Sequence, residues 1–374
     1  ALLAARVHPE PVTWIVLGLM TCGLLAKTAL FPLHIWLPPA HAGAPAAASA
    51  VLSALVIKGS WFLVVRLWFD VMPGVITLSS AQLPGTLGAL AIVVGSVVAL
   101  RQERLKLLVA YSTVAQIGYL FLMFPLAFDV AGNSMAHGGA LTGGLLQAVS
   151  HATAKAGMFM AAGLIYAALG HDRIADLASV ARAMPVTVLA FALAGLALMG
   201  VVPSGAYLAK KLLLDAADGS GQWWWEIVLQ GGAVFTAGYV VLVLVRITRQ
   251  RAAVLSIKRV SRLSEIAALS LSLCSLLLCL AALGPVPGEL VSNPFAHKEI
   301  GTTVLVLLGG TLLAAGLSRQ GLFSSNRTDA SDVGSLRRIG STLGQAFAQA
   351  DLCVRRWLFA SLSLLTLAAL FALP

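Results

Sequence analysis

The sequence predicts an all-α polytopic membrane protein with about ten transmembrane helices. Hydrophobic residues make up 59% of the 374 residues, charged residues only 11%, and the mean hydropathy is +0.91. No soluble domain of this size is so apolar, and several apolar runs are each long enough to cross a bilayer. The strict alternation of a transmembrane β-barrel is absent, so the spans are expected to be helical.

The spans are separated by short segments that contain Gly, Pro, Asn and Asp, as at Pro73-Gly74 and Asp218-Gly219. The predicted spans are 12–33, 45–68, 84–100, 107–127, 141–169, 186–214, 224–247, 263–284, 302–318 and 356–373.

The distribution of basic residues predicts the orientation of these spans. The loops on one side contain seventeen Lys and Arg residues, whereas the side that holds the N-terminus has three, Arg6, Arg66 and Lys298. An excess of Lys and Arg marks cytoplasmic loops. We therefore expect a bacterial inner-membrane protein with both termini on the outer side. The net charge of +10 is explained by these loops, without a nucleic-acid partner.

The five remaining basic residues lie within predicted spans, and all of them are lysine. A lysine at the bilayer centre costs about 2.5–3.5 kcal/mol on insertion scales. Lys27, Lys58 and Lys155 are too deep to extend to the interface, whereas Lys211 has Asp215 one turn further on. A buried lysine is less strongly held in its charged form and can exchange a proton near neutral pH, which arginine cannot do. The use of lysine at all five positions therefore favours a function in proton transport. These residues are Lys27, Lys58, Lys155, Lys210 and Lys211.

His151 precedes Lys155 by four residues, so both lie on one helix face and are interpreted as two stations of a proton relay. All fifteen Asp and Glu residues fall in loops or at span ends. Either these lysines are neutral for much of the time, or another chain or a missing N-terminal part supplies the carboxylate. Because the sequence begins at Ala1, it is interpreted as a fragment, a processed product or half of a split protein.

Prolines interrupt the helices that carry two of these lysines. Pro32 follows Lys27 by five residues, Pro38 and Pro39 repeat the interruption, and Pro203 precedes Lys210. A broken helix beside a titratable residue is typical of ion-transport sites, although a proline kink alone is common in membranes.

The first and sixth spans run in opposite directions, which favours an inverted repeat. His34 and His41 are expected near the cytoplasmic mouth, either as entry groups or as polar loop residues.

Four motifs resemble the antiporter-like proton-pumping subunits of respiratory complex I, and the related subunits of multisubunit Na+/H+ antiporters and membrane-bound hydrogenases. They are "AKTALFPLHIWLPPAHAGAPAAASAVLSALVIKG", "LLVAYSTVAQIGYLF", "SHATAKAGMFMAAG" and "MGVVPSGAYLAKKLLL". The match covers roughly residues 15–250.

This resemblance implies a role for each intramembrane group. Lys27 corresponds to the central lysine of the family's broken seventh helix and Lys58 to the lysine of the eighth. His151 and Lys155 belong to the eleventh helix, and Lys210 is the terminal lysine of the broken twelfth, facing the exit half-channel. One departure is the fifth-helix glutamate that pairs with the seventh-helix lysine, because this chain has no counterpart. The family's double proline is Val202-Pro203 here.

The resemblance also implies the organisation of the chain. Residues 1–68 would be the last two helices of a first inverted repeat, and 84–250 a second five-helix repeat. Residues 251–374 would add C-terminal helices, with a cytoplasmic amphipathic helix near 335–354. Apolar residues recur there at steps of three and four, so this helix is expected either at the interface or on a partner.

The predicted function is that of a proton-translocating subunit of a multisubunit ion-pumping complex. It would be a non-catalytic translocase subunit, for example of an NADH:quinone oxidoreductase-type complex. Its expected partners are other membrane subunits of the complex, and the ion that it moves is H+ or Na+. No cofactor, metal site or nucleotide motif is expected, and the four cysteines have no metal-ligand spacing. The alternatives are a proton-coupling subunit of a CO2/bicarbonate uptake complex with a cytoplasmic zinc partner, and a structural scaffold with degenerate channels.

Overall fold

The computed structural model describes residues 10–130, 138–250, 257–283, 297–319 and 357–371, together with Thr342, Gln345, Ala346 and Gln349. Across these residues the chain is helical, apart from short connections and isolated bridge residues such as the pair Arg104 and Arg173. The all-α prediction is therefore confirmed.

Several crossings are built from more than one helical element. The first half contains α1 (Pro11–Thr28), η2 (Leu33–Trp36), α2 (Leu37–Gly43), α3 (Ala46–Val51), η3 (Leu52–Val56), α4 (Ile57–Val65), η4 (Arg66–Val71), α5 (Leu78–Leu100) and α6 (Leu105–Leu126). The second half contains α7 (Gly138–Leu169), η5 (Ile174–Asp176), α8 (Val180–Ala183), α9 (Pro185–Leu198), α10 (Gly205–Gly219), α11 (Trp224–Thr248), α12 (Arg262–Leu277), η6 (Leu278–Leu283), α13 (His297–Arg319) and α15 (Trp357–Phe371).

Within the described ranges, eight helical stretches are long and apolar enough to cross a membrane. Two shorter apolar helices, Pro185–Leu198 and Ser361–Phe371, complete the set. Each of the ten predicted spans corresponds to one of these stretches, so the chain is an integral membrane protein. The third crossing begins earlier than predicted, at Leu78, because Thr77 and Ser80 form a capping box at its N-terminus.

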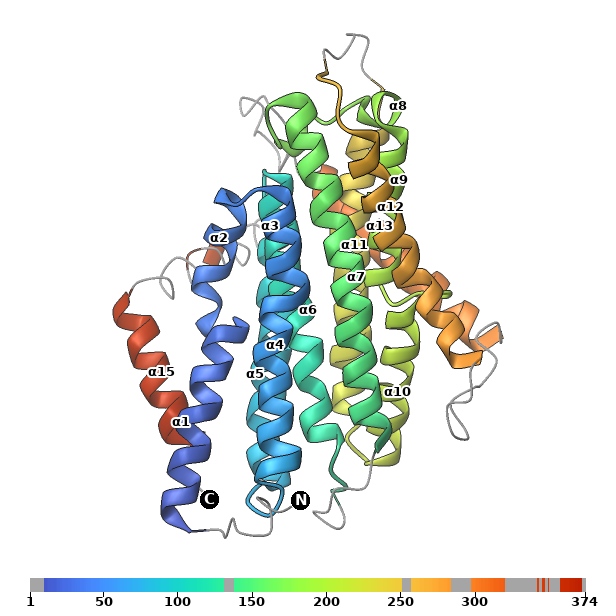
Figure 1. The fold of residues 1–374 in the computed structure, drawn as a ribbon. Coiled ribbons are helices and arrows are strands. Elements are labelled where there is room, and N and C mark those ends of the chain that lie inside the picture. The colour runs from blue at the N-terminus through green and yellow to red at the C-terminus, as the bar shows by residue number, and fades with distance from the viewer. Residues whose placement is uncertain are drawn as a thin grey trace.

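The helices stand side by side as an elongated bundle (Figure 1). α6 lies at its centre, and all of its residues except Leu107 are buried. α5 packs closely against α6 where glycines face each other, because a Cβ added to Gly118 would overlap with the carbonyl oxygen of Gly88. α7 lies next to α6 and packs against α3, α9, α10 and α12.

The last described helix, α15, packs against the first, α1, at the edge of the bundle (Figure 1). The thiol of Cys22 donates a hydrogen bond to the carbonyl oxygen of Leu364 (3.2 Å), and the rings of Trp68 and Phe371 meet edge to face. The predicted amphipathic helix at 335–354 lies outside the described residues, except for four helical, exposed positions: Thr342, Gln345, Ala346 and Gln349.

Candidate functional site

The first crossing is interrupted directly after Lys27. α1 ends at Thr28, and Ala29 adopts a left-handed conformation with φ 60°. The indole of Trp36, on η2, donates a hydrogen bond to the carbonyl oxygen of Ala26 (2.9 Å). The backbone groups released by the break are therefore partly satisfied within the protein, which is what an interruption at membrane depth requires.

The prolines divide between an interruption and a helix start. Pro32 lies in the gap between α1 and η2, as predicted from its missing N–H. Pro38 differs from the prediction, because it lies in the first turn of α2, where a proline N–H would have no helical partner in any case. Pro203 lies between α9 and α10, next to Ser204, whose hydroxyl accepts from the backbone N–H of Tyr207 and caps α10.

Lys27 itself is exposed on this chain, in contrast to the other deep lysines. It forms no hydrogen bond or ion pair with any residue that the structure describes. Its neighbour Thr28 is buried and bonded to the hydroxyl of Ser60 on α4 (3.1 Å). The face of α1 that carries Lys27 is thus left open, whereas the adjacent residue, Thr28, contacts α4.

Lys58 follows a widened helical turn. Residues 52–56 form the π-helical turn η3, and the Lys58 ammonium donates to the carbonyl oxygen of Ser53, five residues before it. The hydroxyl of Ser53 lies 3.3 Å from that of Thr113 on α6. π-helical turns are often found at functional sites because they re-aim side chains and loosen backbone carbonyls.

Lys155 is completely buried and reaches the same part of α6. Its ammonium donates to the hydroxyl of Ser112 and to the carbonyl oxygen of Val109 (3.2 Å). That carbonyl also accepts from the hydroxyl of Thr113 (3.0 Å). Lys58 and Lys155 therefore share one polar cluster on α6, and they repel each other when both are charged.

His151 and His41 lie in this region and are fully buried. Neither ring nitrogen of either histidine has a hydrogen-bond partner among the described residues. His41 stacks on the ring of Phe159 at a centroid separation of 4.3 Å, and both histidines are within electrostatic reach of Lys58 and Lys155. His34 is also buried, so the interpretation of His34 and His41 as polar loop residues was wrong.

Two buried glutamines continue from His151 toward Lys210. Gln147, one turn before His151 on α7, donates from its amide to that of Gln116 on α6 (3.3 Å). The Gln116 amide in turn donates to the hydroxyl of Thr236 (3.2 Å). Both glutamines line a small cavity whose wall also includes Lys210. Neither glutamine was predicted as a site residue, although an amide within an apolar helix is a signal that could have found them.

Lys210 separates this enclosed region from a larger cavity of about 170 Å3. Its ammonium donates to the side-chain carbonyl of Gln230 (3.3 Å). Next to it, Lys211 forms an ion pair with Glu299 on α13 (2.9 Å). The carboxylate that Lys211 contacts is thus supplied by α13, and not by Asp215 one turn further along α10.

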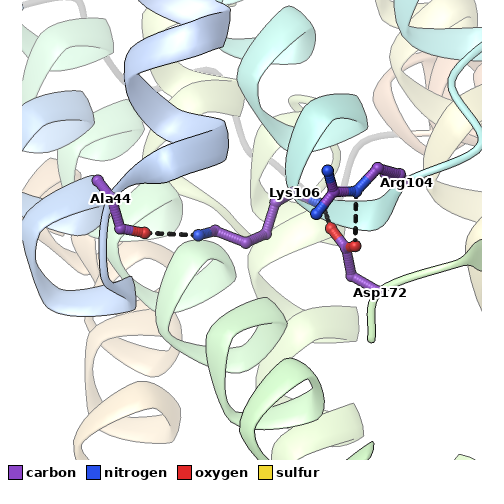
Figure 2. A network of polar contacts seen from close by, with 4 residues as sticks. All are labelled: Ala44, Arg104, Lys106 and Asp172. Carbon is purple, nitrogen blue, oxygen red and sulfur yellow. Dashed lines mark hydrogen bonds and ion pairs between the residues drawn. The ribbon is translucent and has the colours of Figure 1, made fainter. Parts of the chain in front are cut away.

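A third polar group lies at the other end of the bundle, where α6 begins (Figure 2). The ammonium of Lys106 donates to the carbonyl oxygen of Ala44, after α2, at 2.6 Å. Arg104 forms an ion pair with Asp172 (2.8 Å), which also accepts from the backbone N–H of Lys106 (3.2 Å). The sequence pattern places Lys106 in a loop, but it lies in α6 and its side chain is buried.

A match to a known protein family includes most of the region just described. A family model described as "NADH:quinone oxidoreductase/Mrp antiporter, TM" matches residues 2–236, which include every lysine of the site. The chain belongs to this family. The NADH:quinone oxidoreductase/Mrp antiporter match ends within α11, so α12, α13 and α15 lie beyond it.

Two relatives illustrate what the chain is similar to. The chain is 34% identical over 240 residues to NADH-quinone oxidoreductase subunit N of Desulforudis audaxviator, covering 64% of this chain and 46% of that protein. It is 36% identical over 215 residues to a probable K(+)/H(+) antiporter subunit of Rhizobium meliloti, covering 57% of this chain and 20% of that protein. The chain thus spans less than half the length of these two relatives.

Solved structures of the family share its fold. A chain of the Mrp complex from Dietzia superposes with a TM-score of 0.62 at 21% identity, over 86% of this chain and 62% of that one. A chain of respiratory complex I from Thermus thermophilus gives 0.63 at 23% identity, over 83% and 61%.

Proposed function

We propose that this chain is a proton-translocating, antiporter-like subunit of a multisubunit ion-pumping complex. The observation that carries the proposal is the placement of Lys58, Lys155 and His151 in one buried polar cluster at the centre of a membrane protein. Among the described residues, no carboxylate is bonded to either lysine. Groups of this kind are retained at membrane depth when they carry ions or protons.

The proposed path has four stations. Protons pass from Lys27 to Lys58, cross by way of the hydroxyls on α6 to the pair of Lys155 and His151, and reach Lys210. Ser112 and Thr113 supply rotating hydroxyls between the second and third stations, and the glutamine pair connects the third with the fourth. Because the stations repel one another when charged, protonation of one favours loss of a proton from the next.

The exposed position of Lys27 supports a further element of the proposal. A lysine open to the bilayer at this depth is costly unless another protein surface covers it. We infer that a neighbouring transmembrane segment, from a partner subunit or from another part of the protein, packs on this face of α1 and supplies a carboxylate.

The family relatives support the proton-pumping function over the two alternatives. The relatives described above are an NADH-quinone oxidoreductase subunit and a probable K(+)/H(+) antiporter subunit, and neither is a carbon-uptake protein. A degenerate scaffold is also disfavoured, because the buried lysines remain bonded to hydroxyls and carbonyls that hold them in place. The excess of basic loops supports a bacterial inner membrane with both termini outside.

The test measures proton uptake by vesicles that contain the purified complex, with Lys27→Ala and Lys155→Arg compared with the parent chain. Alanine removes the titratable amine of Lys27, and arginine at position 155 keeps the positive charge but does not deprotonate, so both variants are expected to abolish coupled proton transport. Normal transport by both variants would show that the lysines are not stations of a relay. If Lys155→Arg alone transports normally, that residue is a fixed charge and not a proton carrier.

A further inference from the structure

The cavity beside Lys210 contains a carboxylate that the family match does not include. Glu299 lies on α13, more than sixty residues beyond the last matched residue. Its side chain is 15% exposed and forms an ion pair with Lys211 on α10. The same cavity is lined by Lys210, Tyr207 and Gln230.

We infer that Glu299 is the proton acceptor at the end of the path, which rests on the function proposed above. The Lys210 ammonium releases a proton to water in the cavity, and that water delivers it to the carboxylate of Glu299. Lys210 becomes a neutral amine and Glu299 a neutral acid. The acid then loses its proton to bulk water, and the carboxylate returns to its pair with Lys211.

The geometry supports this assignment in three ways. The cavity, at about 170 Å3, has room for several water molecules between Lys210 and Glu299. The side chain of Tyr207 lines the same cavity and its hydroxyl interacts with the carboxylate of Glu299, so that carboxylate faces the cavity. Among the described residues, Lys210 is bonded to a neutral amide alone, that of Gln230, which accepts from either form of the amine.

The ion pair with Lys211 explains why Glu299 stays at the wall of the cavity. Lys210 and Lys211 both lie at this wall, near the one carboxylate of Glu299. The Lys211 ammonium is paired with that carboxylate at an N–O distance of 2.9 Å. Lys211 therefore anchors the acceptor, and Lys210 is left as the lysine that exchanges its proton. The helices beyond the family match thus contribute a functional group and not only packing.

The deciding experiment compares Glu299→Gln, Lys211→Gln and the double variant in vesicles that contain the whole complex. Glu299→Gln is expected to lower proton transport about tenfold or more, as removal of a proton-transfer group does, and the double variant should stay equally low. Lys211→Gln keeps the acceptor but removes its anchor, so transport is expected to fall less than in Glu299→Gln. The control Asp218→Asn, an exposed carboxylate at the end of α10, should transport normally.

Two results would overturn the assignment. Normal transport by Glu299→Gln is one. The other is a drop in both single variants that the double variant repairs, because then the pair serves only to tie α13 to α10. If Glu299→Gln does not assemble, Glu299→Asp decides: it keeps an ionisable carboxyl on a shorter side chain, and total loss of transport by the assembled Asp variant counts against a proton acceptor. Lys27→Ala and Lys155→Arg in the same vesicles separate the two proposals, because normal transport by both of these variants would refute the relay itself.

Discussion

Lys155 bonds directly to α6, the most buried helix of the described chain, and Lys58 is connected to the neighbouring residue of that helix through Ser53, although the two lysines lie nearly a hundred residues apart. Lys155 donates to Ser112, and Lys58 reaches Thr113 by way of Ser53. The two lysines are thus held by neutral oxygens alone within the described residues. Such oxygens accept from both the charged and the neutral form of an amine, so they leave each lysine free to change its charge.

Lys155→Met should abolish proton transport while leaving the complex as stable as before or more so. Methionine has a similar shape, and replacing a buried charge by an apolar side chain is often neutral or stabilising. The measurement pairs transport in vesicles with thermal unfolding of the complex in detergent. A large loss of thermal stability would show instead that Lys155 holds α7 to α6.

Ser112→Ala should slow transport without preventing assembly. The change removes the hydroxyl between Lys155 and the carbonyl of Val109, at a cost to stability of about 1 kcal/mol. Ser270→Ala is the matched control, because that exposed hydroxyl also bonds a carbonyl of its own helix, at 2.9 Å. Equal transport by the two variants would remove Ser112 from the path.

The positions of the spans and of the deep lysines could be predicted because they depend on local sequence. Apolar length marks the crossings, and a lysine in an apolar run is conspicuous without any knowledge of its neighbours. The break after Lys27 could be predicted for the same reason, since Pro32 acts on the turn that precedes it.

The partners of these lysines could not be predicted, because they come from distant helices. Glu299 reaches Lys211 across 88 positions in the chain, and nothing in the sequence near Lys211 distinguishes it from Asp215. Lys106 follows Arg104 closely in the sequence, so the pattern of basic residues predicts a loop at both positions. The helix α6 nevertheless begins at Leu105, and Lys106 is buried within it. The π-helical turn before Lys58 could not be predicted either, because it contains no proline or glycine that would indicate an irregular helix.

Gly118→Ala should destabilise the bundle by about 1–3 kcal/mol or more. The added methyl would overlap with the carbonyl oxygen of Gly88 and with Ile92, so α5 and α6 would have to separate, and overpacking alone typically costs about 1–3 kcal/mol. Gly59→Ala on α4 is the control, because no atom lies within 4 Å of the added carbon. Thermal unfolding of both variants measures the difference, and equal midpoints would contradict the close packing.

Lys106→Met should loosen the junction between α2 and α6. The variant leaves the carbonyl of Ala44 without its ammonium donor, and loss of a hydrogen bond to a charged group costs about 1.5–3 kcal/mol. Hydrogen exchange at residues 40–46 is expected to quicken. Lys258→Met, in an exposed loop, removes the same charge without this bond and should leave exchange there unchanged. Unchanged exchange in Lys106→Met would show that the bond does not hold α2.

Gln116→Leu tests whether the path truly runs between the two halves of the site. Gln116 accepts from Gln147 and donates to Thr236, and it lines the cavity that Lys210 borders. Leucine has a comparable volume but cannot relay or bind water, so the variant should assemble and yet separate His151 from Lys210.

Proton transport by Gln116→Leu is therefore expected to fall strongly, whereas Gln82→Leu should transport normally. Gln82 is the matched control because it also donates to a second glutamine, Gln222, at 2.8 Å, but away from the lysines. If both variants lose transport equally, the effect is one of packing. If neither variant loses transport, protons reach Lys210 by a route that avoids the amides. Only the proposed connection between the third and fourth stations would then be wrong, because Lys58 and Lys155 are connected through α6 independently of Gln116.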